Sequence, residues 1–473
     1  MAFFFPRIAQ GFSAPYPEGY QVSITIPRVP LPELMECLSN SDGPLSVAEQ
    51  LSQRYGEIFQ LRTPQGRMTI VSSFRLFDEL CDTRRFDKVV EGALLDMREL
   101  GGDGLFTVDS DHPNWSRARH VLLPALSPGA VRAYLPTMAV VARRLIARWQ
   151  RLSPEEVIEV GPEMTSVTLD TIGLCGFNYD FECLLETRPH PLIESLSRVF
   201  EQNRERMRAG RSNPEIDAQR KSDVQNIQRI VDDVIGQRQQ QTGCPRDLLQ
   251  TMLERPDPIS GEFLSEENVR NQIVTFLIAG HETTSGLLAF TLHALGQHPQ
   301  VLKRVRQEVD RVLGEDLQTD PDITQIQELS YLRQVLLESL RLWPTVPSLA
   351  VAPREDTHIG GEGYPLPKGS IVKALLTQIQ RDPAIWGPKP DEFWPAHFET
   401  AAVAGRPANA YKPFGNGHRS CLGRAFALNE ASLVLAMLVQ RFNFNPVDDQ
   451  LRIRSTLSIQ PEQFKIRVSP RRR

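Results

Sequence analysis

The stretch FGNGHRSCLGRAFAL, residues 414–428, constrains the fold most, because it places one cysteine among glycines directly before an apolar run. The segment Ala427–Phe442 has the pattern of a buried helix, so Cys421 lies at or just before a helix N-terminus. Unpaired backbone N–H groups and the positive end of the helix dipole favour a thiolate at that position. The chain must therefore fold so that its glycine-flanked backbone closely approaches whatever the thiolate contacts.

Three chemistries remain open for this thiol. With no cysteine or histidine partner at zinc spacing, Cys421 makes a poor zinc site. It could be a nucleophile, the sole protein ligand of a haem iron, or a buried structural thiol. Arg419, two residues before it, adds a cation that could lower the thiol pKa further or bind an anion.

The six cysteines form no recognisable framework. None belongs to a C-x-x-C pair and their spacing is irregular, which is typical of reduced thiols in the cytosol, so we expect a cytoplasmic location. The net charge of −5 argues against a nucleic-acid partner. No stretch approaches the roughly 18 uninterrupted apolar residues of a membrane helix, and the N-terminus lacks signal-peptide features, so no transmembrane segment is expected. The cysteines are Cys37, Cys81, Cys175, Cys183, Cys244 and Cys421.

Helical patterns dominate the chain. Apolar residues recur every three or four positions over 131–152 and 268–297, which predicts two long helices. The polar segment 203–223, interrupted by Gly210 and Pro214, predicts a solvated loop between helices.

Alternating patterns are confined to two short regions. Residues 57–73 alternate around Pro64-Gln65-Gly66 as a hairpin does, and residues 451–469 return to alternation. With no repeat and no linker, we expect a single, mainly α domain with small β-sheets over residues 1–473. Residues 1–44 would form an N-terminal extension of that domain.

The stretch FLIAGHETTSGLLAF departs from the rules of a helix interior. Gly280 costs about 1 kcal/mol relative to alanine, and Thr283 can bond to a preceding carbonyl and bend the helix. The charged pair His281-Glu282 stands among apolar neighbours, a departure that often marks a functional site. A distorted turn with a hydroxyl and an acid could hold water and relay protons. A bent core helix with its polar face toward solvent is the alternative.

Two further stretches pair charged or polar residues at helical spacing. In YLRQVLLESLRLWP, Glu338 and Arg341 share one face of a helix that is apolar nearly all round, so we expect a buried structural ion pair. In HPNWSRARHVLLPALS, Trp115 and Arg119 lie at i and i+4. Both are hydrogen-bond donors only and, together with Arg419, would suit a carboxylate or phosphate. A half-exposed amphipathic helix is the alternative there.

In this order, and over about 300 residues, these four stretches resemble the cytochrome P-450 family of haem-thiolate monooxygenases. Each family motif is short, but all four in the correct order form a specific signal. The resemblance implies the cytochrome P-450 fold, an α-rich triangular prism around a buried haem b (iron protoporphyrin IX). The motifs are F-x-x-G-x-R-x-C-x-G at Phe414–Gly423, A-G-x-[DE]-T-[TS] at Ala279–Thr284, E-x-x-R at Glu338–Arg341 and W-x-x-x-R at Trp115–Arg119.

The sequence is further similar to one branch, the bacterial and fungal fatty-acid hydroxylases whose haem domain is fused to a diflavin reductase. GDGLFT at 102–107, TLDTIGLCGFNYDF at 168–181 and YKPFGNG at 411–417 carry this similarity, which covers most of 45–470. It implies O2 as substrate and NADPH, FAD and FMN in a reductase. The chain has no flavin or nicotinamide fingerprint, so we expect the reductase to be a separate protein or to follow residue 473.

The resemblance assigns roles residue by residue. Cys421 matches the axial thiolate that binds the iron, and Phe414 the aromatic ring packed near its sulfur. Thr283 and Glu282 match the pair that organises water and delivers protons. Further haem-binding positions are Trp115, Arg119, Arg419, Lys88 and Gly415; pocket positions that bind substrate are Phe106, Leu94, Ala279, Val346 and Leu457; structural positions are Glu338, Arg341 and His397.

Two departures from the family pattern bear on function. His397 in PAHF stands where an arginine usually supports Glu338 and Arg341; histidine still donates a hydrogen bond, so we expect the network to survive. In the early hairpin, Arg67 is displaced by one position and Ile70 stands where the branch has a tyrosine that holds the substrate carboxylate. Acyl amides, alcohols and other lipophilic molecules therefore remain open as substrates.

The expected reaction is insertion of one oxygen atom from O2 into a C–H bond, by subterminal hydroxylation of medium- or long-chain fatty acids or acyl derivatives. Alternatives are a peroxide-driven or isomerising haem-thiolate enzyme, a monooxygenase of a non-fatty-acid natural product, and a haem sensor or carrier without turnover. Lys412, Arg117, His418 and Arg424 cluster by motif position, and we expect them to meet an acidic, flavodoxin-like partner.

Overall fold

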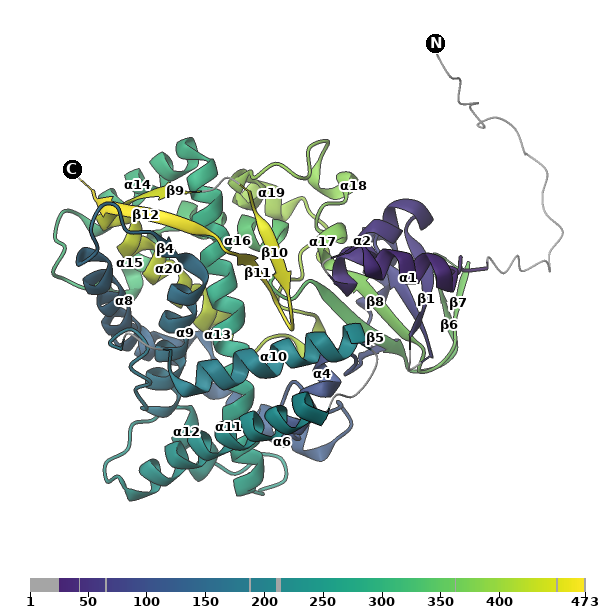
Figure 1. Cartoon of the computed structure of the whole chain (residues 1–473), viewed down its shortest axis with the longest axis horizontal. Coiled ribbons are helices and arrows are strands. Elements are labelled where there is room, and N and C mark those ends of the chain that lie inside the picture. The colour runs from purple at the N-terminus through teal and green to yellow at the C-terminus, as the bar shows by residue number, and fades with distance from the viewer. Residues whose placement is uncertain are drawn as a thin grey trace, which may run out of the picture.

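Helix α13 (Glu266–Gln297) runs through the middle of the helical mass in this computed structural model (Figure 1). The structure describes residues 25–41, 43–63, 66–186, 189–209, 214–361, 363–447 and 450–471. The Ser265 side chain accepts a hydrogen bond from the Asn268 backbone N–H and caps α13, and Glu266 and Glu267 complement the dipole in its first turn. The helix is continuous through Gly280 and Thr283.

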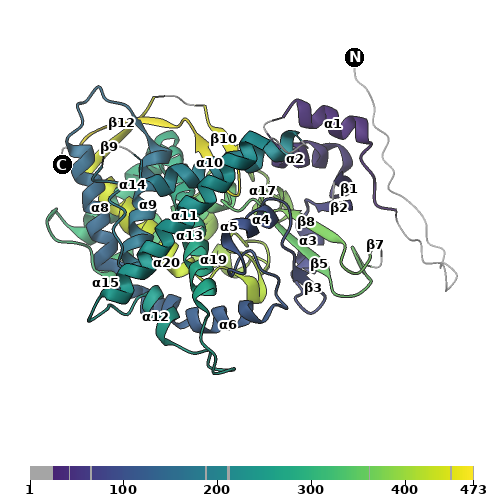
Figure 2. The same ribbon diagram turned by 60° about the horizontal axis from the view of Figure 1, so that its bottom comes forward.

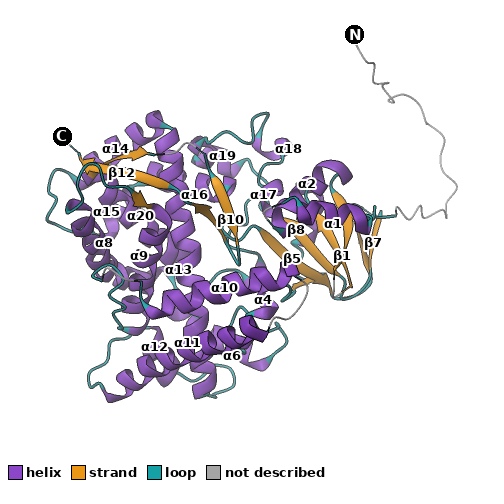
Figure 3. Ribbon diagram, in the orientation of Figure 1, coloured by secondary structure: helices purple, strands orange, loops and turns teal. Residues whose placement is uncertain are grey.

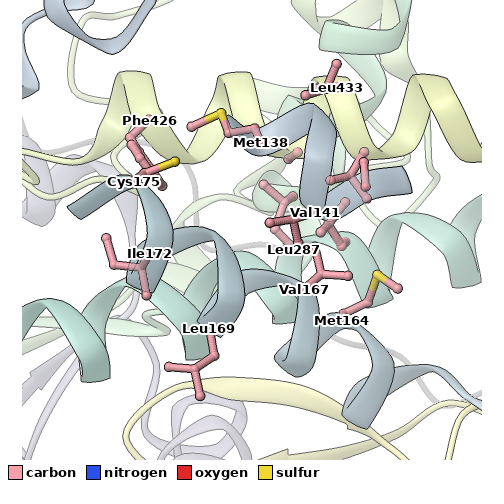
Figure 4. Close-up of a cluster of buried hydrophobic side chains, with 14 of the residues drawn as sticks. Met138, Val141, Met164, Val167, Leu169, Ile172, Cys175, Leu287, Phe426 and Leu433 are labelled. Carbon is pink, nitrogen blue, oxygen red and sulfur yellow. The ribbon is translucent and has the colours of Figure 1, made fainter. Parts of the chain in front are cut away.

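The main core lies where four helices meet. Helices α8 (Leu135–Gln150), α9 (Val160–Phe177) and α20 (Arg424–Arg441) pack around α13, and α9 and α20 bury residues on nearly all sides. Figure 4 shows Met138 of α8, Ile172 of α9 and Leu287 of α13 turned toward one another, with Phe426 and Leu433 of α20 beside them. Because α9 and α20 bury residues on nearly all sides, they lie inside the protein, whereas α8 buries one face.

The largest sheet lies at the other end of the molecule from α8 and α14, and its strands are drawn in orange in Figure 3. One five-stranded sheet has the order β1-β2-β8-β5-β3, in which only the β2–β8 pair is parallel. Helices α1 and α2 cover one face of the β1–β2 hairpin, where Leu34, Leu51, Phe59 and Ile70 form a small core (Figure 2). The expected early hairpin is confirmed, with Ile58 paired to Val71; Pro64 and Gln65 lie outside the described residues.

The expected late β region is also confirmed. It forms a two-stranded sheet, β10-β11, and a three-stranded sheet, β4-β12-β9. The predicted loop at 203–223 is wrong: α10 extends to Ala209 and α11 begins at Pro214, and only residues 210–213 lie outside the described part. Apolar residues at 224, 227, 230, 231 and 234 bury one face of α11, so tertiary packing carries the helix through the polar segment before them.

One described helix, α13, is long and apolar enough to cross a membrane, but 78% of its most apolar window is buried inside the protein. The six cysteines form no disulfide, as expected.

The helices are α1 (Leu31–Ser39), α2 (Pro44–Tyr55), α3 (Phe74–Leu80), α4 (Ala93–Asp96), α5 (Arg98–Gly101), α6 (Pro113–Leu122), α7 (Pro128–Val131), α8, α9, α10 (Pro191–Ala209), α11 (Pro214–Gln240), α12 (Leu248–Glu254), α13, α14 (Pro299–Leu313), α15 (Ile323–Glu328), α16 (Ser330–Leu342), α17 (Leu376–Ile379), α18 (Pro383–Trp386), α19 (Thr400–Ala404) and α20, with 3-10 turns η1 (Pro124–Leu126), η2 (Arg132–Tyr134), η3 (Pro395–Phe398) and η4 (Gly417–Arg419). The strands are β1 (Ile58–Thr63), β2 (Gly66–Val71), β3 (Phe86–Lys88), β4 (Ile158–Glu159), β5 (Ser348–Pro353), β6 (Thr357–Ile359), β7 (Tyr364–Leu366), β8 (Ile371–Leu375), β9 (Phe442–Pro446), β10 (Arg452–Ser455), β11 (Ile459–Glu462) and β12 (Lys465–Pro470).

Candidate active site

A cavity of about 1470 Å³ lies between α13, the cysteine loop, β5 and the β10–β11 turn. It gathers every residue that the sequence assigned to catalysis, cofactor or substrate, although they come from segments far apart in the chain. Only the three residues expected to be structural lie outside its lining. The lining includes Glu282, Thr283, Cys421, Phe414, Trp115, Arg119, Arg419, Lys88, Gly415, Phe106, Leu94, Ala279, Val346 and Leu457.

Cys421 lies in a tight loop three residues before α20. Its backbone N–H donates a 2.8 Å hydrogen bond to the Phe414 carbonyl, and Gly415 and Gly417 adopt φ of 78° and 61°, which favour glycine. The accessible surface of Cys421 faces the cavity. Burial raises the pKa of the Cys421 thiol, and a Gly423 backbone hydrogen bond and nearby cations lower it only in part. A bound metal ion would remove this cost, because a coordinating thiol is deprotonated outright.

Lys88, Arg119 and Arg419 are three of the cations that line the same cavity. Arg119 and Arg419 both lie over the Trp115 ring, with guanidinium carbons 5.7 Å and 4.9 Å from its centroid. Burial lowers the pKa of Lys88 to about 8 and of Arg419 to about 10, and neighbouring cations add to both effects. Arg419 donates one hydrogen bond, to the Val108 carbonyl, while its buried Nη1 has no partner among the described residues. The charges of Asp87 and Asp109 raise the pKa of Arg419 in part. No ion pair joins any of the three cations to a carboxylate among the described residues, so they fit a ligand with negative charges.

Glu282 and Thr283 both line the cavity but bond to different elements. The Thr283 hydroxyl donates to the Ala279 carbonyl at 2.8 Å, one helical turn back. The Glu282 carboxyl accepts a 2.9 Å hydrogen bond from the hydroxyl of Thr456 in the β10–β11 turn. Burial raises the pKa of Glu282, although the Thr456 bond and the charge of Arg454 lower it in part. The acid is therefore more easily protonated than an exposed glutamate.

Lateral hydrogen bonds hold this part of α13 in place. The Thr168 hydroxyl of α9 donates to the His281 carbonyl at 2.9 Å, and the Gln460 amide of β11 donates to the Glu282 carbonyl at 3.0 Å. Burial lowers the pKa of His281 to about 4, so its ring is neutral near pH 7. The His281 ring bonds to the carbonyl of Leu277 in its own helix and does not reach solvent.

The Glu338–Arg341 pair is fully buried, at 0% exposure of both side chains. Arg341 Nη2 and Nε donate to the two Glu338 carboxylate oxygens at 2.7 and 2.8 Å. The Arg341 guanidinium also donates to the Gln380, Pro390 and Glu392 carbonyls, which supplies the additional hydrogen bonds that a buried pair needs.

His397 completes this network. Its Nδ1 lies 3.1 Å from Glu338 Oε1, which fits a hydrogen bond donated by the ring. Burial alone would raise the pKa of Glu338, but hydrogen bonds from Arg341 and His397 bring it below its ordinary value. Arg406 lies beside the network: it donates to the His397 carbonyl, and its guanidinium carbon lies 3.9 Å from the Trp386 ring centroid.

The sequence did not predict the contacts that three residues make near the site. Thr456 contacts Glu282 across 174 positions, and Arg406 reaches His397 from a segment without helical or strand pattern. Arg424 was noted only as a surface cation, yet its guanidinium carbon lies 5.4 Å from the Phe414 ring centroid. A polar residue in an alternating β segment carries no local signal for a contact so distant in sequence.

Comparison with known proteins decides the family. A family model described as Cytochrome P450 matches residues 26–468. The chain belongs to the cytochrome P450 family. A bifunctional cytochrome P450/NADPH–P450 reductase of Bacillus cereus is 43% identical over 92% of the chain and 41% of its own length. A second such protein, from Bacillus subtilis, is 41% identical over 98% of the chain and 43% of its own length.

A fungal relative shows the same partial coverage. The self-sufficient cytochrome P450 monooxygenase of Phanerodontia chrysosporium is 36% identical over 94% of the chain and 43% of its own length. The chain therefore spans about two-fifths of the length of these relatives. The P450 family and fold expected from the motifs are confirmed.

The cofactor of this P450 is haem, and the cavity fits it. Two thiols line it, Cys81 and Cys421; Cys421 stands at the motif position for the iron, and Lys88, Arg119 and Arg419 offer cations for the two propionates. The unpartnered Nη1 of Arg419 is an orphaned donor that a propionate oxygen would satisfy. In the described part of the chain no cluster of three or more metal-ligating side chains exists, so Cys421 would be the protein's single ligand to the iron.

Proposed function

We propose that this P450 hydroxylates medium- or long-chain acyl substrates at carbons short of the terminus, with O2 and electrons from an NADPH-dependent diflavin reductase. The observation that carries the proposal is one continuous cavity, which reaches from Cys421 past Phe106 and Ala279 to the β1–β2 hairpin. Its shape suits a long apolar molecule better than a small polar one. We also propose that residues 1–473 form one haem domain. A cytoplasmic location stays a prediction from the free thiols.

The chemistry of oxygen activation belongs to the haem, whose thiolate ligand favours O–O cleavage. The chain's own residues place the substrate and hold protons. Phe106, Leu94 and Val346 give the cavity an apolar wall against which an acyl chain is dehydrated. Burial raises the pKa of Glu282, which makes its carboxyl easier to protonate, and Thr283 presents a hydroxyl to the same cavity. Together they would pass protons from the protein side to the reacting site.

Support for an anionic head group comes from the β1–β2 hairpin. Arg62 and Arg67 are directly opposite in the antiparallel register, and both are exposed. Like charges in this position destabilise a hairpin, and no ion pair joins either one to a carboxylate in the described residues. Arg62 lines the mouth of the cavity, together with the apolar Met35 and Leu38. We infer that Arg62, supported by Arg67, binds the substrate carboxylate in place of the tyrosine that Ile70 replaces.

The head-group proposal is tested by the shift of haem iron from low to high spin on substrate binding. We expect Arg62→Gln to weaken binding of a fatty acid about tenfold or more and to leave binding of the matching fatty alcohol unchanged. Arg132→Gln, at an exposed arginine in η2, is the control. Equal losses for acid and alcohol would exclude a carboxylate anchor.

The reductase partner is proposed from the relatives' names and from surface charge. Arg117 bonds to Glu262, and His418 Nε2 lies 3.4 Å from Asp87, so these two of the four expected cations are partly neutralised. Lys412 and Arg424 have no ion-pair partner among the described residues. They would meet an acidic flavin domain, whether fused or separate.

The proposed reaction is tested with NADPH, a supplied diflavin reductase and a panel of acyl substrates. We expect NADPH oxidation to match hydroxylated product, and Cys421→Ser to abolish the thiolate-type spectrum of the reduced carbon monoxide complex. Turnover with peroxide alone would instead identify a peroxide-driven enzyme. Persistence of the thiolate-type spectrum in Cys421→Ser would overturn the assignment of the ligand.

A further inference from the structure

Arg424 stands in a position that stability alone does not explain. It is the first residue of α20, whose first turn contains no acid, so its charge faces the positive end of the helix dipole. Arg333 of α16 is close enough that the charge of Arg424 lowers its pKa. In the part of the chain that the structure describes, no ion pair joins Arg424 to a carboxylate. Such a breach of local rules is expected where a residue has a functional task.

The surroundings of Arg424 in the cysteine loop offset part of the electrostatic cost of its charge at the helix N-terminus and beside Arg333. The Arg424 guanidinium carbon lies 5.4 Å from the centroid of the Phe414 ring, within the range of a cation–π interaction. Cys421 lies three residues before Arg424, and its backbone N–H donates a 2.8 Å hydrogen bond to the carbonyl of the same Phe414. Arg424 is exposed and does not line the cavity, whereas Phe414 and Cys421 do. The guanidinium therefore lies near the Phe414 ring without belonging to the cavity lining.

We propose that Arg424 is a positioning residue that, held over Phe414, places a fixed positive charge beside the Cys421 thiolate and raises the reduction potential of the haem. The physical reason is electrostatic: a nearby cation stabilises the state with one more electron. Lys88 and Arg119 also face Cys421, but they line the cavity, where anionic groups of the cofactor would neutralise them. The charge of Arg424 has no such counter-ion.

The proposal rests on Cys421 being the thiolate ligand, and its consequence can be measured without turnover. The reduction potential of the haem-loaded chain is titrated spectroelectrochemically for wild type, Arg424→Gln and Arg424→Lys. We expect Arg424→Gln to lower the equilibrium constant for reduction roughly threefold to tenfold, the upper figure equal to about 59 mV. Arg424→Lys keeps the charge and should recover most of the wild-type value. Raising the salt concentration should reduce the difference, because an exposed charge is screened.

Two further variants separate charge from packing. In Phe414→Leu the ring no longer holds the guanidinium, so Arg424→Gln should have a smaller effect in that background. Arg311→Gln, at an exposed arginine of α14, is the matched control and should leave the potential unchanged. An unchanged potential in Arg424→Gln, an equal shift in Arg311→Gln, or a loss in Arg424→Lys as large as in Arg424→Gln would each overturn the proposal.

The reduced carbon monoxide complex distinguishes failure of this inference from failure of the assigned ligand. If wild type lacks the thiolate-type spectrum, the assignment of Cys421 as the ligand is wrong, and so is the inference about Arg424. If all variants keep that spectrum and one potential, only the role of Arg424 falls. Loss of the spectrum in Arg424→Gln with retention in Arg424→Lys would support the proposal, because charge alone would then preserve the thiolate.

Discussion

The Thr456 hydroxyl donates a 2.9 Å hydrogen bond to the Glu282 carboxyl and so ties the β10–β11 turn to the middle of α13. Burial raises the pKa of Glu282, and this bond counteracts that rise because it stabilises the ionised form. The turn therefore helps to set the protonation state of the acid that faces the cavity. This contact ties the acid of the proposed proton pathway to the β10–β11 turn as well as to its own helix.

Replacement of Thr456 by valine should raise the pKa of Glu282 further. The side chain keeps its shape but loses the donor, so the carboxyl becomes ionised only at higher pH. Infrared spectra of the protonated carboxyl across a pH series measure the midpoint, with Glu282→Gln identifying the band. Thr319→Val, in an exposed loop, is the control. A midpoint that does not move would show that burial alone governs Glu282.

Truncation of His397 to alanine should destabilise the fold by about 1–3 kcal/mol, because Glu338 loses one hydrogen bond in a buried site. The effect remains limited because Arg341 and the Trp394 backbone N–H still donate to the carboxylate. Urea unfolding of the haem-loaded chain measures the free energy. His358→Ala, an exposed histidine in β6, should change it by less than about 0.5 kcal/mol. Equal losses in the two variants would contradict a role for His397 in the network.

Acid should weaken the same network. The folded pKa of Glu338 lies below its ordinary value of 4.5, so its contribution to stability is fully present above that value. It is lost as pH falls through the lower, folded pKa, when the carboxylate is protonated. Glu338→Gln should cost about 3–5 kcal/mol at pH 7, because Arg341 is left buried and uncompensated. The variant should also show a weaker pH dependence of the unfolding free energy below 4.5.

Glu392→Gln provides the comparison for that acid series. Glu392 pairs with Lys389 at 2.7 Å, but both side chains are exposed, so the substitution should cost less than about 1 kcal/mol at pH 7. A loss in Glu338→Gln no larger than in Glu392→Gln would contradict the view that the buried pair supports the fold.

Substitution of Gly417 by alanine should loosen the cysteine loop. Gly417 has φ of 61°, and a Cβ there would collide with the Thr83 side chain. Backbone strain of this kind costs about 1–3 kcal/mol. We expect a lower melting temperature and faster loss of haem to an acceptor protein. Thr83→Ala combined with Gly417→Ala removes the collision but keeps the strain, so partial recovery is expected. Full wild-type haem retention in Gly417→Ala would contradict a tight loop.

Local patterns predicted the parts of this protein that depend on neighbours in sequence. The glycine-flanked Cys421, the buried helix after it and the Glu338–Arg341 pair are each visible within a few residues, because helical spacing and backbone freedom are local properties. The early hairpin and the long helix α13 followed from periodicity in the same way.

The predicted loop at 203–223 failed for the opposite reason. A polar composition indicates exposure, but α10 and α11 form there because their apolar faces pack against other helices. Helix propensity and polarity are weak predictors of secondary structure wherever tertiary packing supplies most of the helix stability. The apolar residues that stabilise α10 and α11 by packing lie on both sides of the polar segment.

By itself the sequence predicted which residues line the cavity, including a thiol, three cations and an acid–hydroxyl pair. Only the tertiary structure decided their partners. In the structure Glu282 bonds to Thr456 rather than to Thr283, and the Arg424 guanidinium lies near the Phe414 ring, whereas the support of Glu338 by His397 was already expected from the sequence. Hydrogen bonds and charges act over a few ångströms of space, and the distance along the chain between such partners leaves no trace in local periodicity.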